Sequence, residues 1–325
     1  MSHYINPFVD YGFKKLFATE TNKDLLISFL NAILDDKTDP VVDLIYKNVE
    51  QIGDFNGTRT NYFDVYCETK TKRQFIVEMQ NCWKPFFKDR TVYYATKPIR
   101  DQGVLGIQKT EEQEEKRERE FKQNGKPWNF RLNEVYLIAI MNFTFPKKEY
   151  GPKSYFHKVM LTDIDDHHVF YDKLTMYYVE MPKLKDIDME LTTPRDKWLH
   201  ALYHLWSGDD YPKELDEEIF HKFYEQAEYA NFTPEQQLAY ERSRKVYLDT
   251  YNEIEGGRIM GLMEGYMLGL KKGLEGKGKK DEKEGLTEDV AKIKEKAIQR
   301  MKTLGLDDDT IHQYVDMIEE EFLIV

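Results

Sequence analysis

The sequence contains few cysteines, and this shortage excludes two common ways of supporting a fold. Its 325 residues include two cysteines, Cys67 and Cys82, too few for a disulfide scaffold or for a zinc site with four cysteine ligands. Both stand in apolar strings, so we expect buried thiols. Among the eight histidines, His200 and His204 are four residues apart, but aromatic residues surround them and no glutamate intervenes. This pattern favours a packed helix face over a metal site.

Long apolar runs and a surplus of positive charge are also missing. No run approaches the roughly 20 apolar residues of a transmembrane helix, and the first residues do not join a basic end to an apolar stretch. We therefore expect no membrane association, no secretory signal and a cytoplasmic location. The net charge of −12 argues against a general nucleic-acid coat protein, which binds by neutralising phosphates. A DNA enzyme with a local basic groove remains compatible with it.

The apolar pattern predicts alternating helices and strands. Residues 22–35 have helical spacing with Asn22 as the cap, and residues 85–103 predict another helix with a kink or break at Pro98. Strands are predicted at residues 42–49, 62–69, 74–80, 134–145, 156–161 and 174–180. The strand at 134–145 is the strongest and is expected in the centre of the sheet. The turn at 70–73 predicts a hairpin, and the last two strands predict another.

The later parts of the chain have simpler patterns. Residues 108–126 are almost entirely polar, which is typical of an exposed excursion. From 193 to 255 the pattern is helical, and residues 276–285 predict a linker. Residues 286–322 predict two short helices, with Asp308 or Asp309 capping the second.

Acidic and amide side chains interrupt the apolar strands of the hairpin at 62–80. Asp64 stands mid-strand, and Glu78 and Gln80 follow an apolar run on the next strand. A charged group in an apolar strand costs several kcal/mol unless it is paired or bound to a metal. Strand alternation puts Glu78 and Gln80 on one face. The turn brings Asp64 opposite residues 78–80 on the neighbouring strand, with the pairing uncertain by about one residue pair. The register decides whether all three share a face, and the sequence leaves the register open.

If the three side chains converge, the hairpin supports phosphodiester hydrolysis. Asp64 and Glu78, with the backbone carbonyl of Met79, suit a hard divalent cation such as Mg²⁺ or Mn²⁺, which prefers oxygen ligands. Such a metal polarises a phosphate and lowers the pKa of a bound water. Gln80 would orient that water or stabilise charge. The alternative is that the two acids are ordinary solvent-facing strand residues, because their spacing is a loose pattern.

Several segments, taken in order, resemble the PD-(D/E)XK nuclease family transposases, which are related to the Rpn family of recombination-promoting nucleases. The segments are NPFVDYGFKKLF (6–17), NKDLLISFLNAIL (22–34), FDVYC (63–67), FIVEMQ (75–80), FFKDRTVYYATKPIRDQ (86–102), VYLIAIMNF (135–143), FYDKLTMYYVEMPK (170–183) and DKWLHAL (196–202). The resemblance spans residues 4–255. It implies a PD-(D/E)XK restriction-endonuclease-like α/β core, a mixed central sheet flanked by helices, with a helical C-terminal extension. It also implies that Asp64 and Glu78 are metal ligands and that Glu-x-Gln is this branch's form of the Glu-x-Lys signature.

Two positions depart from the name-giving pattern. Phe63 stands where the proline would be, and Gln80 replaces the lysine. An amide is a weaker electrostatic group than an ammonium for stabilising developing negative charge. Slow chemistry, or none, is therefore one interpretation of this sequence.

Other residues support the predicted site. The resemblance makes Asp10, beside the first helix, a candidate catalytic residue, and Lys14 follows at helical spacing; a helix cap near Gly12 with solvated lysines is the alternative. The helix after the hairpin carries basic and aromatic residues that suit a DNA backbone. We expect Lys14, Lys88, Arg90 and Tyr94 to bind DNA, with Arg90 and Tyr94 forming the site wall; packing against the sheet is the alternative for that pair.

The tail carries glycines at every fourth position. They stand at 257, 261, 265, 269 and 273, without the Gly-Lys-Ser or Gly-Lys-Thr of a P-loop. Each glycine disfavours a helix by roughly 1 kcal/mol relative to alanine, so we expect close contact with another helix in return. The prediction is a homo-oligomer formed through residues 256–275, and the alternative is a flexible linker.

These observations predict a nuclease-like core at 1–190, a helical segment packed on it at 191–255, a glycine-repeat helix and linker at 256–285 and a small helical tail at 286–325. The favoured function is a Mg²⁺-dependent or Mn²⁺-dependent DNA endonuclease, with an association to recombination or mobile elements that comes from the resemblance. One alternative is a catalytically weak DNA-binding or assembly protein that keeps the fold. Another is an interaction scaffold built on the tail.

Overall fold

The computed structural model describes residues 3–47, 50–51, 61–104, 131–146, 150–151, 153–187, 189–207, 211–275, 294–303 and 306–323. The chain divides into two compact units, Met1–Tyr247 and Leu248–Val325. The predicted excursion at 108–126 and the predicted linker at 276–285 lie outside the described residues. The finer division into a core, a packed helical segment and a tail stays a prediction.

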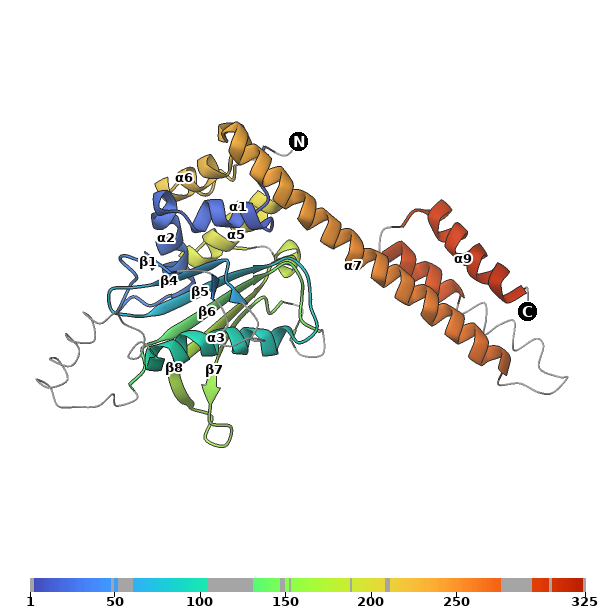
Figure 1. Ribbon diagram of the computed structural model, residues 1–325, viewed down its shortest axis with the longest axis horizontal. Coiled ribbons are helices and arrows are strands. Elements are labelled where there is room, and N and C mark those ends of the chain that lie inside the picture. Colours follow the sequence, from blue (N-terminus) through green and yellow to red (C-terminus); the bar gives the residue numbers. More distant parts are fainter. Residues whose placement is uncertain are drawn as a thin grey trace, which may run out of the picture. The chain divides into compact units, whose positions relative to one another are not determined.

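A six-stranded sheet of mixed direction forms the centre of the first unit (Figure 1). Its strands, in spatial order, are β1 (Ile45–Tyr46), β4 (Val65–Glu68), β5 (Gln74–Gln80), β6 (Val135–Met141), β8 (Val169–Glu180) and β7 (Phe156–Thr162). β6 is parallel to both neighbours, whereas the β4–β5 and β8–β7 pairs are antiparallel. Both predicted hairpins and the central place of residues 134–145 are thereby confirmed. A separate pair joins β2 (Glu50–Gln51) to β3 (Asn61–Tyr62).

Helices cover both faces of the sheet (Figure 1). One face carries α1 (Asp10–Phe17), α2 (Lys23–Leu34), α5 (Pro194–Ser207) and α6 (Glu218–Ala227), and the other carries α3 (Phe87–Val104). Short 3₁₀ segments lie at Glu20–Asn22, Met181–Asp186 and Tyr229–Asn231. Within the described part of the chain, no helix is both long enough and apolar enough to cross a bilayer.

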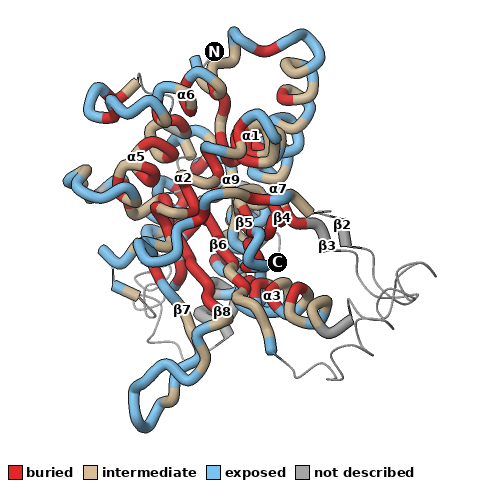
Figure 2. The backbone as a smooth tube through the Cα atoms, turned by 90° about the vertical axis from the view of Figure 1, so that its left-hand side faces the viewer, coloured by how far each residue is buried: buried red, intermediate tan, exposed pale blue. Residues whose placement is uncertain are grey.

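Strand alternation divides the core into two apolar clusters, and the strands between them are buried (Figure 2). Val77 and Val179 face the four-helix side, where Trp198 of α5 is buried among aromatic rings. Ile76 and Leu137 face the opposite side with Phe87 and other residues of α3. The face that a side chain takes therefore decides which helices it meets.

Two local predictions were confirmed only in part. Asn22 holds the N-cap position of α2, but its side chain makes no capping hydrogen bond; it is buried, and its Nδ2 donates to the Lys15 carbonyl at 2.9 Å. Of the strand predicted at 42–49, Ile45–Tyr46 forms and residues 42–44 do not, while residues 48 and 49 lie outside the described residues. Just before this segment, the Asn31 side chain bonds both backbone groups of Val41.

The helix predicted at 85–103 begins at Phe87 and continues past Pro98. Cys67 is buried as expected, whereas Cys82 is half-buried.

The second unit begins within α7 (Pro234–Glu275) and also contains a helix at 294–303 and α9 (Asp308–Leu323). Its small core consists of Met301, Ile311 and Val315. Asp307 caps α9, since its carboxylate accepts the Thr310 N–H at 2.8 Å. The predicted cap at Asp308 or Asp309 was therefore wrong by one or two residues. The pair of helices at 286–322 is otherwise confirmed for the described residues.

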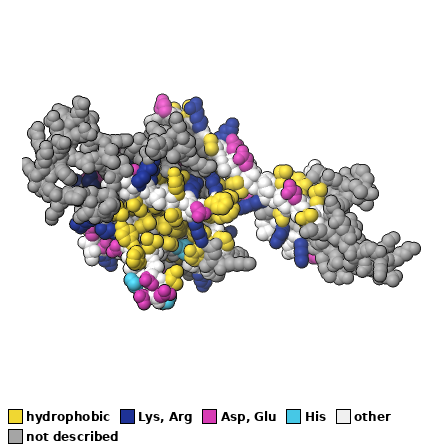
Figure 3. All heavy atoms as spheres, turned by 60° about the horizontal axis from the view of Figure 1, so that its bottom comes forward, with side chains coloured by type: hydrophobic (Ala, Val, Ile, Leu, Met, Phe, Trp, Pro, Cys, Tyr) yellow, Lys and Arg dark blue, Asp and Glu magenta, His cyan; other side chains and the backbone are white. Residues whose placement is uncertain are grey.

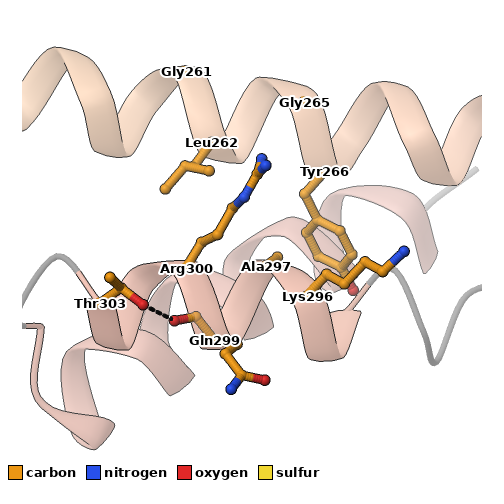
Figure 4. A pocket seen from close by; sticks show the side chains of 9 residues that line it. All are labelled: Gly261, Leu262, Gly265, Tyr266, Lys296, Ala297, Gln299, Arg300 and Thr303. Atoms are coloured by element: carbon orange, nitrogen blue, oxygen red, sulfur yellow. Dashed lines mark hydrogen bonds between the residues drawn. The ribbon is translucent and has the colours of Figure 1, made fainter. Parts of the chain in front are cut away.

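A pocket of about 610 Å³ lies between α7 and the helix at 294–303 (Figure 4). Its lining comprises Gly261, Leu262, Gly265, Tyr266, Lys296, Ala297, Gln299, Arg300 and Thr303. In Figure 4, Tyr266 and Arg300 extend into the space between the two helices from opposite sides. None of the residues predicted for catalysis lines this pocket.

Three glycines of the predicted repeat have no close neighbour inside the chain. A Cβ atom added at Gly257, Gly261 or Gly265, or at the preceding Gly256, would meet no atom within 4 Å among the described residues. The close contact that we expected is thus missing at these three positions of the repeat inside one chain. Self-association through residues 256–275 stays a prediction.

Gly12 of α1, by contrast, has no room for a side chain. An added Cβ would lie 2.5 Å from the carbonyl oxygen of Asn6, which accepts the Val9 N–H at 3.1 Å. The Asn6 N–H donates to the Tyr240 hydroxyl at 2.8 Å, so the Asn6 backbone is held on both sides. Close backbone approach explains a glycine inside this helix.

We expect Gly12→Ala to destabilise the protein by roughly 1–3 kcal/mol, because overpacking against fixed backbone exceeds the gain in helix propensity. Chemical denaturation of the full chain measures this difference. Gly151→Ala is the control, since an added Cβ there meets nothing within 4 Å. Equal stability of the two variants would contradict the packing argument.

Candidate active site

The β4–β5 register brings Asp64 and Glu78 together. Val65 pairs with Val77, and one further step of that register places Asp64 opposite Glu78. The Asp64 carboxylate accepts the Met79 N–H at 2.7 Å, which fixes its position at the end of the ladder. Alternation puts Asp64, Glu78 and Gln80 on the same face as Ile76, toward α3. The sequence left this question open, and the structure answers it in favour of convergence.

Gln80 connects Glu78 to α3. Its Nε2 donates to Glu78 Oε2 at 2.9 Å, and its Oε1 accepts from Arg90 Nη1 at 3.3 Å. Arg90 Nη2 lies 3.8 Å from Glu78 Oε2, close enough for an ion pair. Both ends of the Gln80 amide are therefore occupied by neighbouring side chains.

Tyr94 holds Arg90 one helical turn away. Arg90 Nε donates to the Tyr94 hydroxyl at 2.9 Å, and the guanidinium carbon lies 4.9 Å from the ring centroid. The Tyr94 ring meets Phe63 edge-on at 5.5 Å. The i, i+4 spacing thus orients the arginine toward the carboxylates.

Both carboxylates have raised proton affinity, with Glu78 buried and Asp64 half-buried. Glu78 is 2% exposed, and burial, followed by the charge of Asp64, raises its pKa well above the usual value. Burial also raises the pKa of Asp64, to about 6, although the Met79 N–H opposes this rise. Like charges in a site of low polarity disfavour the ionised form of each other.

Helix α1 contributes charge to the same site. Asp10 is the first residue of α1, and its carboxylate pairs with Lys14 Nζ at 2.8 Å. The Asp10 charge raises the pKa of Asp64, whereas Lys14 lowers the pKa of both Asp64 and Glu78. The predicted residues Asp10 and Lys14 therefore act on the carboxylate pair as an exposed ion pair.

Lys88 is placed differently. It is exposed on the first turn of α3, and its Nζ lies over the rings of Phe145 at 5.0 Å and Tyr150 at 5.6 Å. Arg90 and Lys14 are the cations that lower the pKa values of Asp64 and Glu78. The structure thus brings Arg90 and Lys14, but not Lys88, to the carboxylates.

A buried acid that sequence reasoning missed gives a contrast to Glu78. Glu180, at the end of β8, is 0% exposed. Its Oε2 accepts the Phe145 N–H at 2.8 Å, and its Oε1 lies 2.6 Å from His157 Nε2 and 2.8 Å from Lys183 Nζ. Like Glu78, it follows a run of apolar residues within its strand, so the same sequence signal was present. Its carboxylate is satisfied by the protein.

Glu78 is not satisfied in the same way. Its Oε1 is buried and has no hydrogen-bond partner within the described structure. An ionised oxygen without a partner is unfavourable in the interior. Glu78 thus differs from Glu180 in keeping one buried carboxylate oxygen unpaired among the described residues.

A second acidic group lies in the turn between β7 and β8. Asp163, Asp166 and His168 have ligand atoms within 4.8 Å of one another. Asp163 Oδ1 accepts the N–H groups of Asp165 and Asp166, so turn formation accounts for its position. Figure 3 shows a face where hydrophobic side chains gather beside a small group of acidic and histidine side chains.

The comparisons with known proteins agree with this geometry. The family model described as PD-(D/E)XK nuclease family transposase matches residues 7–257. The match includes every residue predicted for catalysis, metal binding or DNA binding. No curated protein and no solved structure matches the chain. The mixed six-stranded sheet with helices on both faces is the α/β architecture that the resemblance implied, and the chain belongs to the PD-(D/E)XK nuclease family transposases.

Proposed function

We propose that the protein is a metal-dependent DNA endonuclease that acts in recombination or in the processes of mobile elements. The observation that carries this proposal is the pairing of Asp64 with the buried Glu78, whose Oε1 has no partner in the described structure. A structural acid at this depth would be satisfied, as Glu180 is. The family match supports the same reaction class.

The donor atoms fit a hard divalent cation, Mg²⁺ or Mn²⁺. Asp64 and Glu78 would hold it through carboxylate oxygens, which such ions prefer, with the Met79 carbonyl as a further ligand. A positive charge at this place would stabilise both ionised carboxylates, whose pKa values are raised first by burial and then by a neighbouring acid, Asp10 for Asp64 and Asp64 for Glu78. When bound, the metal polarises the scissile phosphate and acidifies a water.

Arg90 supplies the positive charge that this branch lacks at position 80. Its guanidinium contacts Gln80 and approaches Glu78, and Tyr94 fixes its orientation. Arginine presents several donors in a planar fork that suits a phosphate. Gln80, with both amide ends occupied, positions Glu78 and Arg90 rather than orienting water.

DNA is the proposed substrate, and its backbone would be held by Lys14, Lys88, Arg90 and Tyr94. Lys14 and Arg90 lie beside the carboxylates, while Lys88 extends the basic surface along the first turn of α3. With a net charge of −12, the protein depends on this local contact. Binding should therefore be weak and should fall steeply with salt.

A catalytically weak DNA-binding or assembly protein is the second candidate. The observation in its favour is that Arg90 Nη2 stays 3.8 Å from Glu78 and that position 80 holds an amide. A gel shift at low salt in EDTA separates this candidate from a scaffold that does not bind DNA. Metal-dependent nicking of plasmid DNA separates the nuclease from both.

We expect Asp64→Asn and Glu78→Gln to abolish Mg²⁺-dependent nicking, because each removes a charged ligand while keeping the shape of the site. Plasmid relaxation by the purified full chain is the measurement. Asp166→Asn is the matched control, an exposed acid in the β7–β8 turn, and should nick as the wild type does. Full activity of both site variants would contradict the assignment.

We also expect the acids to make stability depend on pH in the absence of metal. Because their folded pKa values are raised, to about 6 for Asp64, their protonated forms stabilise the fold below about pH 4. That stability is lost as pH rises through 6, so Glu78→Gln should gain Tm over the wild type at pH 8, by about 5 °C. Thermal unfolding in EDTA at pH 4 and pH 8 measures the gain. A gain of equal size at both values would show that ionisation is not the cause.

Arg90→Ala should lower nicking by about 10²-fold or more, as expected when a charge that stabilises the transition state is removed. Adding Gln80→Lys to that variant should restore much of the activity, because the lysine returns a positive charge beside Glu78. Rates at saturating plasmid distinguish this effect from weaker binding. If Arg90→Ala nicks normally, or if the lysine fails to rescue it, the assigned role of Arg90 is wrong.

A further inference from the structure

An exposed aromatic segment lies at the rim of the proposed site. Residues 83–86, Trp-Lys-Pro-Phe, are all exposed, with Trp83 at 49% and Phe86 at 79%. The segment follows Gln80 in the chain and precedes Arg90. Because the side chains of Gln80 and Arg90 contact each other, both ends of this loop converge on the carboxylates. The two exposed rings are therefore carried by a loop that begins and ends next to residues of the proposed site.

Phe86 is held in a conformation that a bulky residue avoids. Its φ is 61°, in the left-handed region, where a side chain of this size is strained. Its carbonyl accepts the Arg90 N–H at 3.0 Å, so it forms the entry to α3. The backbone thus keeps the ring in solvent, although a ring that served only the core would be buried. Strained residues of this kind concentrate at ligand-binding sites.

We infer that Trp83 and Phe86 form a stacking platform for unpaired nucleobases, so that the preferred substrate is single-stranded or locally unpaired DNA. This inference rests on the proposed function for the identity of the ligand. Trp and Phe rings stack on the faces of all bases, and duplex DNA hides those faces. An unpaired nucleotide next to the cleaved bond would place its base against the rings and its phosphate at the carboxylates.

The chemistry of the loop favours nucleic acid over a protein partner. Lys84 lies between Trp83 and Phe86 in the sequence and is exposed, and Arg90 and Lys14 lie at the carboxylates. Aromatic rings alternating with cations match a ligand that alternates bases with phosphates. Pro85 restricts the loop backbone, which lowers the entropy lost on binding.

Fluorescence anisotropy of labelled DNA in EDTA tests the inference without any cleavage. The probes are a single strand of about 30 nucleotides, its blunt duplex and the same duplex with an internal unpaired bulge. We expect the wild type to prefer the single strand and the bulge over the duplex by at least about 10-fold. Trp83→Ala and Phe86→Ala should each weaken binding to the unpaired probes by about 5- to 150-fold, the equivalent of one base stack, and leave duplex binding unchanged.

Phe170→Ala is the matched control, because Phe170 of β8 is an aromatic of similar exposure, 75%, away from the loop. It should bind all probes as the wild type does. Trp83→Phe should keep the affinity, since it keeps a ring, and should remove the tryptophan quenching that the single strand causes. These two variants separate stacking from a general loss of folding.

Several outcomes overturn the inference. They are equal binding of paired and unpaired probes by the wild type, absence of binding to either, or unchanged binding in both alanine variants. A fall in molecular mass by light scattering in these variants, with DNA binding intact, would assign the rings to self-association instead. If the protein nicks DNA with metal but the loop variants change nothing, the stacking inference is wrong and the nuclease proposal stands. If the loop variants weaken binding but the protein does not nick DNA, the nuclease proposal is wrong and the stacking inference stands.

Discussion

The enforced approach of the Asp64 carboxylate to the buried Glu78 carboxylate is the constraint on which the site depends. The two residues are brought together by a strand register that cannot slip by one residue without turning every apolar side chain of β4 to the other face. The core thus enforces a contact that the charges oppose, since the Asp64 charge adds to burial in raising the pKa of Glu78. Such a contact persists when the rest of the fold contributes more favourable free energy than the contact costs.

The other elements of the site moderate this repulsion from three directions. The Met79 N–H of β5 binds Asp64, Gln80 donates to Glu78, and Arg90 of α3 approaches both Gln80 and Glu78. None of these contacts reaches Glu78 Oε1 within the described residues. The Glu78 carboxylate therefore has only part of its hydrogen bonds and ion pairs supplied by the protein, on the side where the ion would bind. Both oxygens of Glu180, at the end of β8, have such partners. A divalent cation at the carboxylates would complete what the protein leaves undone.

The sequence was sufficient for features that depend on local periodicity. Alternation located β5 and β6, and the polar turn at 70–73 predicted the hairpin that joins Asp64 to Glu78. It was insufficient where a side chain reaches a distant group. Asn22 holds the N-cap position of α2 as predicted, but its amide donates to the Lys15 carbonyl, and no local pattern places the Lys88 ammonium over Phe145 and Tyr150. The pairing of Glu180 with His157 joins residues that no local pattern relates.

A contact between distant residues also explains how the site can lack a lysine at the signature position, where it has Gln80. A lysine at 80 would bring its charge from the strand itself, whereas Arg90 brings charge from α3, one turn before Tyr94 and four residues after Phe86. The charge at the carboxylates is then tied to the loop at 81–86, because that loop sets where α3 begins. A shift of the loop would move Arg90 relative to Gln80 and Glu78. The inferred stacking of bases on Trp83 and Phe86 would therefore be linked to the electrostatics of the carboxylate pair through one short segment of backbone.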